Sequence, residues 1–597
     1  MDNVKTLNKV NTVNIKINGK EYGVDKNSTI LEACKAASID IPTLCYMKDI
    51  NAIGSCRICL VEVKGARNLV AACVQPINEG MEIMTNSPAV QKARKTNLEL
   101  ILSDHKKDCL DCIRNQNCEL QKMCKDFAVE DEHYFKGERS EFPVEHSTIF
   151  LVRDNNKCIK CRRCVAACQK LQDISVIGAN DRGFDTHIGC AFELNLADVP
   201  CISCGQCIVA CPTGALYEKD DTQKIWDAIA DPKKHVVICT APSIRATLGE
   251  CFGMEPGSFV QGKMVAALNR MGFDGVYDMD MTADLTIMEE ASELVERIQN
   301  GGKLPMITSC SPGWIKYCEH YFPEFIDNLS TCKSPQQMFG AIYKSYYAQK
   351  KNIDPKDIIV VSVIPCTAKK FEITREGQSA NMAADGDEID DIDIAITTRE
   401  LGRMITRAGI NFHNLPDEEF DAPIETASGA GVIFGTTGGV MEAALRTAAE
   451  TILGEPLEKV DFEEVRGIAG IKKASYKLGD IEIKVAVASG TANAKKVLNA
   501  VKDGELDVQF IEIMGCPGGC INGGGQPVQP MNIRNFTDLK TARSKALYSE
   551  DARLTLRKSH ENPIIKELYE NYLEKPGSGK AHHLLHTHYK KRNQYAK

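Results

Sequence analysis

The strongest constraint on the fold of this chain is a cysteine pattern that occurs twice between residues 158 and 211. Both runs have the spacing C-x2-C-x2-C-x3-C, and Pro212 follows the second run. Thiolates at this spacing bind 4Fe–4S cubes, and the fourth cysteine of each run then serves the cube of the other run. The pattern predicts two cubes, one held by Cys158, Cys161, Cys164 and Cys211 and the other by Cys201, Cys204, Cys207 and Cys168.

This repeat is typical of bacterial two-cluster ferredoxins, and neighbouring cubes of that kind let electrons hop from one to the other. We therefore expect a ferredoxin domain over residues 136–222 that works as an electron wire. The whole chain carries 26 cysteines, most of them before residue 212. Its first residues lack the apolar core of a signal peptide, so we expect a cytoplasmic protein whose thiols bind metal and do not form disulfides.

A further metal centre is predicted near the start of the chain. Residues 13–30 have the pattern of a β-hairpin, and a helix is expected to begin at ILEAC. Beyond it the spacing C-x10-C-x2-C-x13-C is formed by Cys45, Cys56, Cys59 and Cys73. Four thiolates from tight loops in a small β-rich domain favour a 2Fe–2S cluster, although four thiolates also suit zinc. We expect a β-grasp-like 2Fe–2S domain over residues 1–90.

The next segment, residues 91–135, combines one histidine with three cysteines in a predicted helical hairpin, here called the histidine–cysteine hairpin. The pattern H-x3-C-x2-C-x5-C is formed by His105, Cys109, Cys112 and Cys118. Such a set of one imidazole and three thiolates can bind zinc or a 4Fe–4S cluster, and the residues alone leave both open.

From about residue 225 the sequence alternates between β-branched runs, turns and helical periods. This order predicts an α/β domain with mostly parallel sheets over residues 223–540. Three turns within it are TSCSPGW (308–314), PCTAKKFE (365–372) and MGCPGGCINGGGQP (514–527). Each follows a predicted strand, where open α/β sheets place their ligands. Their cysteines are Cys310, Cys366, Cys516 and Cys520, which could hold another cube or be four unrelated buried thiols.

Two further segments belong to this part of the chain. The run GAGVIFGTTGGVMEAALR (429–446) predicts a strand, a glycine loop and a helix, without the lysine of a phosphate-binding loop. The basic tail, residues 541–597, has a helical pattern and is rich in histidine. We expect these histidines to be surface or wrapping residues and not ligands: His560, His582, His583, His586 and His588.

The three turns resemble the signature motifs of the FeFe-hydrogenases, and the resemblance covers nearly the whole chain. In that family the cube is bridged through one cysteine to a diiron centre that carries CO, cyanide and a dithiolate, and this H-cluster makes or oxidises H2. The resemblance also implies that the histidine–cysteine hairpin holds a 4Fe–4S cluster and that the tail corresponds to a separate small subunit of some relatives. The implied cofactors are one 2Fe–2S cluster, three accessory 4Fe–4S clusters and the H-cluster.

The first motif departs from the family pattern, which usually has two consecutive cysteines. Here the pair is Cys310-Ser311. By position Cys310 matches the residue that shuttles protons, and Ser311 matches a ligand of the cube. Two interpretations follow: Cys310 takes over ligation with Ser311 as a hydroxyl relay, or Cys310 stays the proton donor and Ser311 is a weak ligand or none.

The resemblance implies further site residues. Residues 284–298 predict a helix with three charged positions on one face, which by themselves favour a solvated surface. The family instead places its proton route at the positions of Cys310, Glu290, Ser330, Glu293 and Arg297. Lys369 matches a lysine that pairs with a cyanide ligand, where an ammonium beside an anion is favourable. Residues lining the diiron pocket correspond to Pro242, Ser243, Gln336, Phe434 and Met514.

Charge and hydropathy restrict the partners. The net charge is −9, and the sequence has no apolar run long enough for a membrane span, so we expect neither nucleic acid nor membrane as a partner. The expected electron partner is a ferredoxin or a flavin- and NAD(P)-binding hydrogenase subunit, and maturation proteins must build the diiron unit. The alternatives are an H2 sensor with little turnover, a non-catalytic iron–sulfur scaffold and an electron-transfer subunit of the complex I or formate dehydrogenase type. That third alternative explains only about the first 220 residues.

Overall fold

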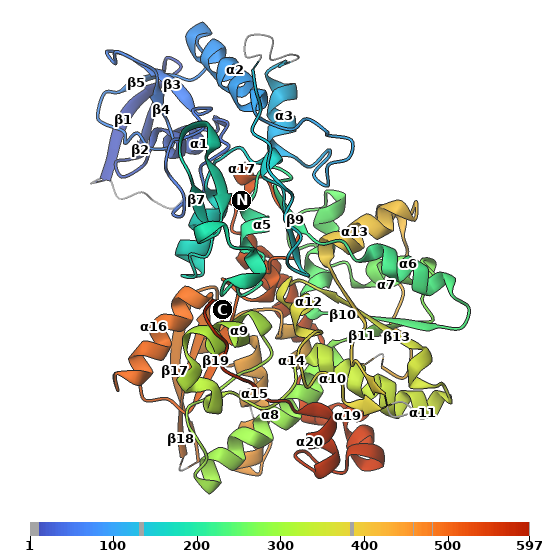
Figure 1. The fold of residues 1–597 in the computed structure, drawn as a ribbon. Helices are drawn as coiled ribbons and strands as arrows, with labels where there is room; N and C mark the ends of the chain where they lie inside the picture. Colours follow the sequence, from blue (N-terminus) through green and yellow to red (C-terminus); the bar gives the residue numbers. More distant parts are fainter. Residues whose placement is uncertain are drawn as a thin grey trace.

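The computed structural model describes residues 11–129, 137–382, 387–424, 426–457, 459–479 and 481–595. An N-terminal part, a narrow middle part and a large C-terminal part follow one another along the molecule (Figure 1). The predicted sequence of a β-rich region, a helical hairpin, a ferredoxin-type segment and a large α/β region is confirmed. In the described residues no helix is long and apolar enough to cross a membrane.

The N-terminal sheet has five strands in the order β2-β1-β5-β3-β4. β1 and β2 form the predicted antiparallel hairpin, and β5 runs parallel to β1. Thr29 caps helix α1 (Ile30–Ala36) through a capping box with Glu32, so the helix begins where the sequence predicts. The strands are β1 (Thr12–Ile17), β2 (Lys20–Asp25), β3 (Leu60–Val63), β4 (Val70–Ala71) and β5 (Glu82–Met84).

The histidine–cysteine hairpin contains two helices, α2 and α3, and a cysteine-rich segment follows them. Ser87 caps the first helix, whose first residue is a proline that needs no hydrogen-bond partner. In the next segment β6 pairs with β9 and β7 pairs with β8, both antiparallel. The elements are α2 (Pro88–Ser103), α3 (Glu119–Asp126), β6 (Leu151–Arg153), α4 (Arg163–Ala166), β7 (Gly178–Asn180), β8 (His187–Gly189), α5 (Gln206–Ala210) and β9 (Leu216–Glu218).

Two four-stranded sheets form the core of the large C-terminal part. The first, β11-β10-β13-β16, is entirely parallel. The second, β12-β19-β18-β17, has one antiparallel pair, β17 with β18. Of its central strands, β19 is buried at every position and β18 is buried from Val485 onward, as expected for strands covered on both faces. The strands are β10 (His235–Thr240), β11 (Gly275–Asp278), β12 (Met306–Ile307), β13 (Ile358–Ile364), β16 (Ile394–Thr397), β17 (Ile471–Leu478), β18 (Ile481–Ser489) and β19 (Phe510–Met514).

Helices cover both sheets (Figure 1). The longest, α8, begins at Asp280 and so is longer at its start than residues 284–298 predict. Arg245 holds that first turn in the interior, because its guanidinium pairs with Asp278 at 2.7 Å and with Asp280 at 2.9 Å. The helices are α6 (Thr222–Ala230), α7 (Gln261–Arg270), α8 (Asp280–Asn300), α9 (Pro312–Tyr321), α10 (Pro335–Ile342), α11 (Ala348–Lys351), α12 (Ala368–Glu372), α13 (Thr398–Arg407) and α16 (Thr491–Lys502). Helix α17 (Met531–Arg534) lies away from these sheets, near the N-terminal part (Figure 1).

The predicted strand at the start of residues 429–446 is wrong, because this stretch is helical. It forms α14 (Gly429–Ile433), a short turn and α15 (Gly439–Leu453). A short apolar run fits a buried helix as well as a strand. Close packing explains the glycines: a Cβ atom on Gly431 would lie 2.4 Å from the carbonyl oxygen of Asp280.

The C-terminal segment is helical, as predicted, and packs onto the α/β region. Its helices are α18 (Leu539–Arg553), α19 (Pro563–Leu568) and α20 (Gly579–Leu585), which contact α14, α8 and α10 in turn. Arg446 of α15 is fully buried and binds both Glu442 and Asp551 at 2.8 Å, so it ties α15 to α18.

Replacing Arg446 by Met should lower the free energy of unfolding by about 3 kcal/mol, because it leaves buried carboxylates with fewer partners. The measurement is denaturation followed by tryptophan fluorescence. The two tryptophans of the chain, Trp226 and Trp314, both lie in the large C-terminal part. Arg553→Met is the matched control, since Arg553 also pairs with a glutamate but its side chain is 71% exposed. Equal effects of both substitutions would contradict the prediction.

Candidate functional site

The two cysteine runs of the middle part line two separate cavities. The first cavity is lined by three thiols of the first run and one of the second: Cys158, Cys161, Cys164 and Cys211. The second has the converse composition: Cys168, Cys201, Cys204 and Cys207. Each cavity is otherwise mainly apolar. Four thiols around a small apolar cavity are the donor set of a 4Fe–4S cube, so the residues present fit this group.

The four N-terminal thiols also lie together. The Sγ atoms of Cys59 and Cys73 are 3.4 Å apart. A hydrogen bond between the thiols of Cys45 and Cys56, together with backbone hydrogen bonds with Cys56 and Ser55, lowers the pKa of Cys45 to about 6. This set of buried or half-buried thiols from tight loops fits the predicted 2Fe–2S cluster.

The candidate ligands of the histidine–cysteine hairpin are brought together less completely. Cys112 and Cys118 lie near each other and against the end of the second cysteine run: the Sγ of Cys118 is 3.7 Å from the Pro212 oxygen. Cys109 is exposed. His105 is buried, its burial lowers its pKa to about 4, and its Nδ1 has no hydrogen-bond partner among the described residues. An unpartnered, neutral imidazole is what a metal ligand requires.

Direct contacts connect the N-terminal cysteine loop to the first cavity and the second cavity to the cysteine turns of the C-terminal part. The side-chain amide of Asn51 donates to the carbonyl oxygens of Cys45 at 2.8 Å and Cys161 at 3.1 Å, which joins the N-terminal loop to the first cavity. At the second cavity, the Thr367 hydroxyl donates to the carbonyl oxygen of Ser203 at 2.7 Å. Gly524 packs so closely that an added Cβ atom would lie 2.0 Å from the Cys204 oxygen. The second cavity therefore abuts the turns that follow β13 and β19.

Those turns bring three cysteines to one place. Cys366 follows β13, whereas Cys516 and Cys520 follow β19. The thiols of Cys366 and Cys516 are hydrogen bonded, and Cys520 interacts electrostatically with both. The turn needs glycine at residue 519, where φ is +93° and an added Cβ atom would lie 2.6 Å from the Thr437 nitrogen. Three thiols converging on parallel strand ends fit the predicted cube.

Cys310 and Ser311, after β12, have different neighbours. The hydroxyl oxygen of Ser311 accepts a hydrogen bond from the backbone nitrogen of Gly515 at 3.0 Å, directly beside Cys516. The pKa of Cys310 is raised by burial and then by the charges of Glu290 and Cys520. Ser311 thus lies at the turn that carries Cys516, and Cys310 lies near both Glu290 of α8 and Cys520.

The charged face of α8 is buried, so the prediction of a solvated surface is wrong. Glu290 is 0% exposed, and the side chains of Glu293 and Arg297 are only 14% and 13% exposed. The Ser330 hydroxyl donates to Glu293 at 2.9 Å, and Arg297 pairs with Glu293 at 2.5 Å. Burial, followed by the charge of Glu293, raises the pKa of Glu290 to about 8. Hydrogen bonds therefore join Ser330, Glu293 and Arg297, whereas neither carboxylate oxygen of Glu290 has a hydrogen-bond partner among the described residues.

The residues implied for the diiron pocket are buried around the same turns. Pro242 and Ser243 begin the turn after β10, while Phe434 and Met514 belong to the adjoining apolar core. Gln336 donates to Glu372 at 3.1 Å, and its oxygen accepts from Ser362.

Two residues were missed by the sequence reasoning. Glu372 accepts hydrogen bonds from Lys369 at 2.9 Å and from Ser334 at 2.9 Å, so it orients the predicted lysine. Gln526 donates to the Cys520 carbonyl oxygen and to the Ser243 hydroxyl, which joins two parts of the pocket. Both lie inside the cysteine motifs, and this position was the available signal.

Comparison with known families divides the chain in the same order. Residues 10–88 match the "2Fe-2S iron-sulfur cluster binding domain", and residues 94–133 match the "NADH-ubiquinone oxidoreductase-G iron-sulfur binding region". Residues 157–215 match the "4Fe-4S dicluster domain". Residues 234–524 match "Iron only hydrogenase large subunit, C-terminal domain", and residues 537–592 match "Iron hydrogenase small subunit".

Similar proteins cover nearly all of the chain. It is 50% identical to the NADP-reducing hydrogenase subunit HndD of Solidesulfovibrio fructosivorans, over 97% of this chain and 99% of that protein. It is 44% identical to iron hydrogenase 1 of Clostridium pasteurianum, over 97% of this chain and 100% of that protein. The solved structure of apo [FeFe]-hydrogenase HydA1 from Chlamydomonas reinhardtii aligns with a TM-score of 0.56 and 42% identity, and covers 63% of this chain and 100% of that one.

Proposed function

Because this chain belongs to the FeFe-hydrogenase family, we propose that it interconverts protons, electrons and H2 at an H-cluster served by accessory iron–sulfur clusters. The observation that supports this reaction most strongly is that candidate electron carriers and candidate proton carriers meet at the cysteine turns. Thiol-lined cavities approach the turns from the N-terminal side, and a buried acid series approaches them along α8.

We assign the cofactors by donor set. Cys366, Cys516 and Cys520 would hold the cube of the H-cluster, and the pocket residues around Lys369 would hold its diiron unit. The accessory groups would be one 2Fe–2S cluster, a 4Fe–4S cluster at the histidine–cysteine hairpin and the two cubes of the middle part. When bound, these groups supply one-electron carriers and the iron at which H2 is formed or split.

On the electron side, the chain holds the sites in a fixed series. Asn51 ties the loop of Cys45 to the loop of Cys161, and both carbonyl contacts are buried. The contact of Thr367 with Ser203 does the same between the middle part and the cysteine turns. Electrons would therefore enter at the two N-terminal sites, cross the two cavities and leave at Cys204, which lies near Cys516.

On the proton side, each residue has a distinct task. Cys310 would exchange a proton with Glu290, whose raised pKa lets it donate near neutral pH. Ser330 would pass the proton to Glu293, to which its hydroxyl is already hydrogen bonded. Arg297 holds Glu293 in place at the outer end, where both side chains reach partial exposure.

The pocket itself would exclude water and present one positive charge. Pro242, Phe434 and Met514 contribute apolar surface, and Ser243 and Gln336 contribute hydrogen-bonding groups. Lys369 would pair with an anionic ligand of the cofactor, with Glu372 orienting its ammonium group. We assign Cys310 as the proton donor and Ser311 to the side of the cube, because Ser311 is hydrogen bonded to Gly515, the residue before Cys516, and the charge of Glu290 acts on Cys310.

We propose a flavin- and NAD(P)-binding partner subunit as the electron partner. This rests on the 50% identity to a subunit of an NADP-reducing hydrogenase over nearly the whole of both chains. A soluble ferredoxin is the second candidate. Maturation proteins would build the diiron unit, and the many free thiols favour a cytoplasmic location.

Infrared spectroscopy of protein matured with the diiron cofactor tests the function, together with H2 evolution from reduced methyl viologen. CO and cyanide bands between roughly 1800 and 2100 cm⁻¹ belong to the cofactor alone, since protein vibrations leave this window clear. We expect both bands and turnover. Bands without turnover would favour an H2 sensor, and absence of bands in protein with intact accessory clusters would refute the proposal.

The crossed pairing of cysteines can be tested in the same material. Cys211→Ala should remove the signal of the cube whose other three ligands are in the first cysteine run. Cys168→Ala should remove the signal of the cube whose other three ligands are in the second run. In electron paramagnetic resonance of the reduced protein, each variant should lose one cubane signal and the spin coupling between the two. Cys190→Ala is the control, because this buried thiol lines neither cavity. Loss of the same cube in both variants would contradict the pairing.

A further inference from the structure

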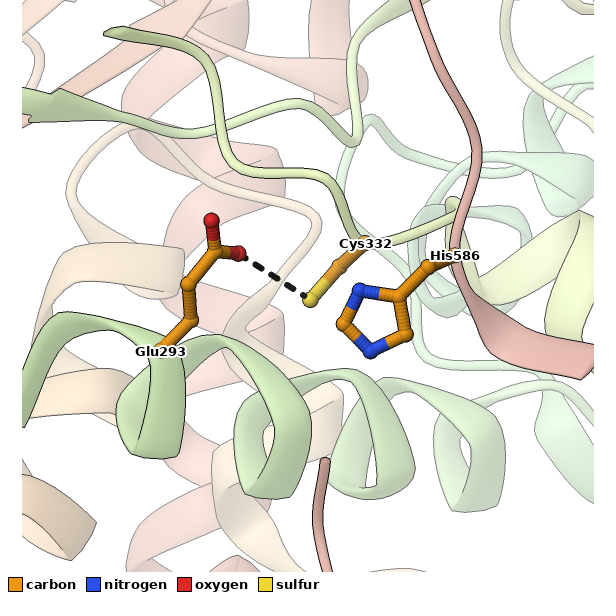
Figure 2. Close-up of side chains that lie close together, drawn as sticks. All are labelled: Glu293, Cys332 and His586. Carbon is orange, nitrogen blue, oxygen red and sulfur yellow. Dashed lines mark hydrogen bonds between the residues drawn. The ribbon is translucent and has the colours of Figure 1, made fainter. Parts of the chain in front are cut away.

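A cluster of three potential metal ligands lies beside the buried acid series of α8. It consists of Glu293, Cys332 and His586, whose ligand atoms all lie within 4.8 Å of one another. Figure 2 shows the three side chains facing one another, with Glu293 on a helix and the other two on separate segments. Carboxylate, thiolate and imidazole together are a typical donor set for zinc.

Backbone contacts hold two of these ligands in register. Cys332 and His586 form an isolated antiparallel β-bridge. On either side of it, the backbone nitrogen of Lys333 donates to Leu585 at 2.7 Å, and that of Thr587 donates to Thr331 at 2.8 Å. The C-terminal segment is thereby fixed against the loop before α10, and the position of His586 does not depend on its side chain alone.

A buried glutamate orients the imidazole toward the cluster. The Nε2 atom of His586 is 3.1 Å from Glu289, which also accepts hydrogen bonds from Tyr569 at 2.5 Å and Gly577 at 2.8 Å. Because a carboxylate can only accept, Nε2 carries the hydrogen, and Nδ1 carries the lone pair. The Thr331 hydroxyl donates to this lone pair at 2.7 Å. Metal-binding histidines commonly have such a carboxylate on the nitrogen that does not bind metal.

We propose that Glu293, Cys332 and His586 form a binding site for a divalent zinc-type cation. The cation would bind the Cys332 sulfur, His586 Nδ1 and a Glu293 oxygen, with water as a fourth ligand. It would displace the Thr331 hydroxyl from Nδ1, and Cys332 would release its thiol proton to the buffer. In a tetrahedral zinc site, sulfur and oxygen ligands lie about 3.6 Å apart. The Cys332 sulfur and Glu293 oxygen are already 3.7 Å apart, so closure mainly requires a small shift of the imidazole.

The consequence for turnover rests on the proposed function. Glu293 accepts the Ser330 hydrogen bond in the proposed proton route, and the same oxygen faces Cys332. A cation on that oxygen would displace the Ser330 hydroxyl and hold Glu293 deprotonated. Zinc would therefore act as a reversible inhibitor of H2 turnover by interrupting proton transfer between Ser330 and the surface.

X-ray absorption at the zinc edge tests the site without reference to activity. One equivalent of Zn²⁺ is added to full-length protein with its iron–sulfur clusters loaded. We expect a single sulfur at about 2.3 Å with nitrogen and oxygen at about 2.0–2.2 Å. Cys332→Ala should remove the sulfur, and both Cys332→Ala and His586→Gln should weaken binding at least tenfold. His582→Gln is the control, since this exposed ring stacks on His586 at 4.7 Å but is not one of the three clustered ligands.

A shell of several sulfurs, a sulfur retained in Cys332→Ala, or no bound zinc would overturn the site. In a parallel assay, zinc should inhibit H2 evolution of the native protein reversibly, and both variants should keep their basal rate and need at least tenfold more zinc. Zinc bound with the expected shell but without inhibition would overturn the blocking role alone. Protein without H2 turnover would refute the proposed function, while the absorption spectrum would still decide the metal site.

Discussion

Replacing Glu290 by Gln is expected to lower the rate of H2 evolution about 10²–10⁴-fold, the usual contribution of a positioned proton-transfer group. Glu290 is the only acid of the proposed route that is completely buried. It is near Cys310 on one side of the route and near Ser330 and Glu293 on the other. Glutamine keeps its size and polarity but cannot gain and lose a proton. The infrared bands and iron content should therefore remain those of the native protein while turnover is lost.

The measurement is viologen-driven H2 evolution and infrared spectroscopy on the same samples. Glu296→Gln is the matched control, because Glu296 lies on the same helix but is exposed. Its rate should equal that of the native protein. If Glu290→Gln retained a rate within threefold of native, protons would reach the site by another path and the proposed route would be wrong.

Proton donation by Glu290 should make the rate of H2 evolution decrease with rising pH. The pKa of Glu290 is about 8, so the carboxyl group is protonated and able to donate at neutral pH, and H2 evolution should fall as the pH rises above about 8. The shift also affects stability. Because the folded pKa lies above the ordinary value of 4.5, the native state loses stability as the pH rises from 4.5 to about 8. Glu290→Gln should remove this loss in denaturation at about pH 5 and about pH 9.

Replacing Cys310 by Ala is expected to have an effect of similar size, about 10²–10⁴-fold on turnover, with the cube retained. The reason is its placement: Cys310 lies near Glu290, whereas the neighbouring Ser311 hydroxyl accepts a hydrogen bond from Gly515, the residue before Cys516. Ser311→Cys should keep turnover and shift the cube's reduction potential, since a thiolate is a softer ligand than a hydroxyl group.

Iron content, electron paramagnetic resonance and infrared spectra distinguish the two roles. Cys310→Ala with intact cube signals and no turnover would support proton transfer by this thiol. Loss of the cube signals would show that Cys310 is a ligand and that Ser311 serves the proton route. Cys318→Ser is the control, because this buried thiol on α9 only donates to the Phe322 carbonyl oxygen, a contact that serine can keep.

Much of this fold could be predicted because its signals are local. The hairpin β1–β2, the start of α1 and the parallel strands β10, β13 and β19 follow from turn residues, a capping residue before ILEAC and β-branched runs. The prediction was wrong at residues 429–433, where the same short apolar run fits a strand or a buried helix. Packing of Gly431 against Asp280 decides between them, and nothing within the run reports that contact.

The candidate site, too, was predicted in part from the sequence and in part could be seen only in the folded chain. The cysteine spacing was enough to indicate which thiols can act together, because two intervening residues place neighbouring thiols within reach of one cluster whatever the rest of the fold. The burial of the charged face of α8 could be learned only from the folded chain, since charge spacing is identical on a solvated helix and on one covered by other segments. The same holds for the meeting of Glu293, Cys332 and His586. Contacts between residues so far apart in sequence depend on how the C-terminal segment docks, and no local pattern encodes that docking.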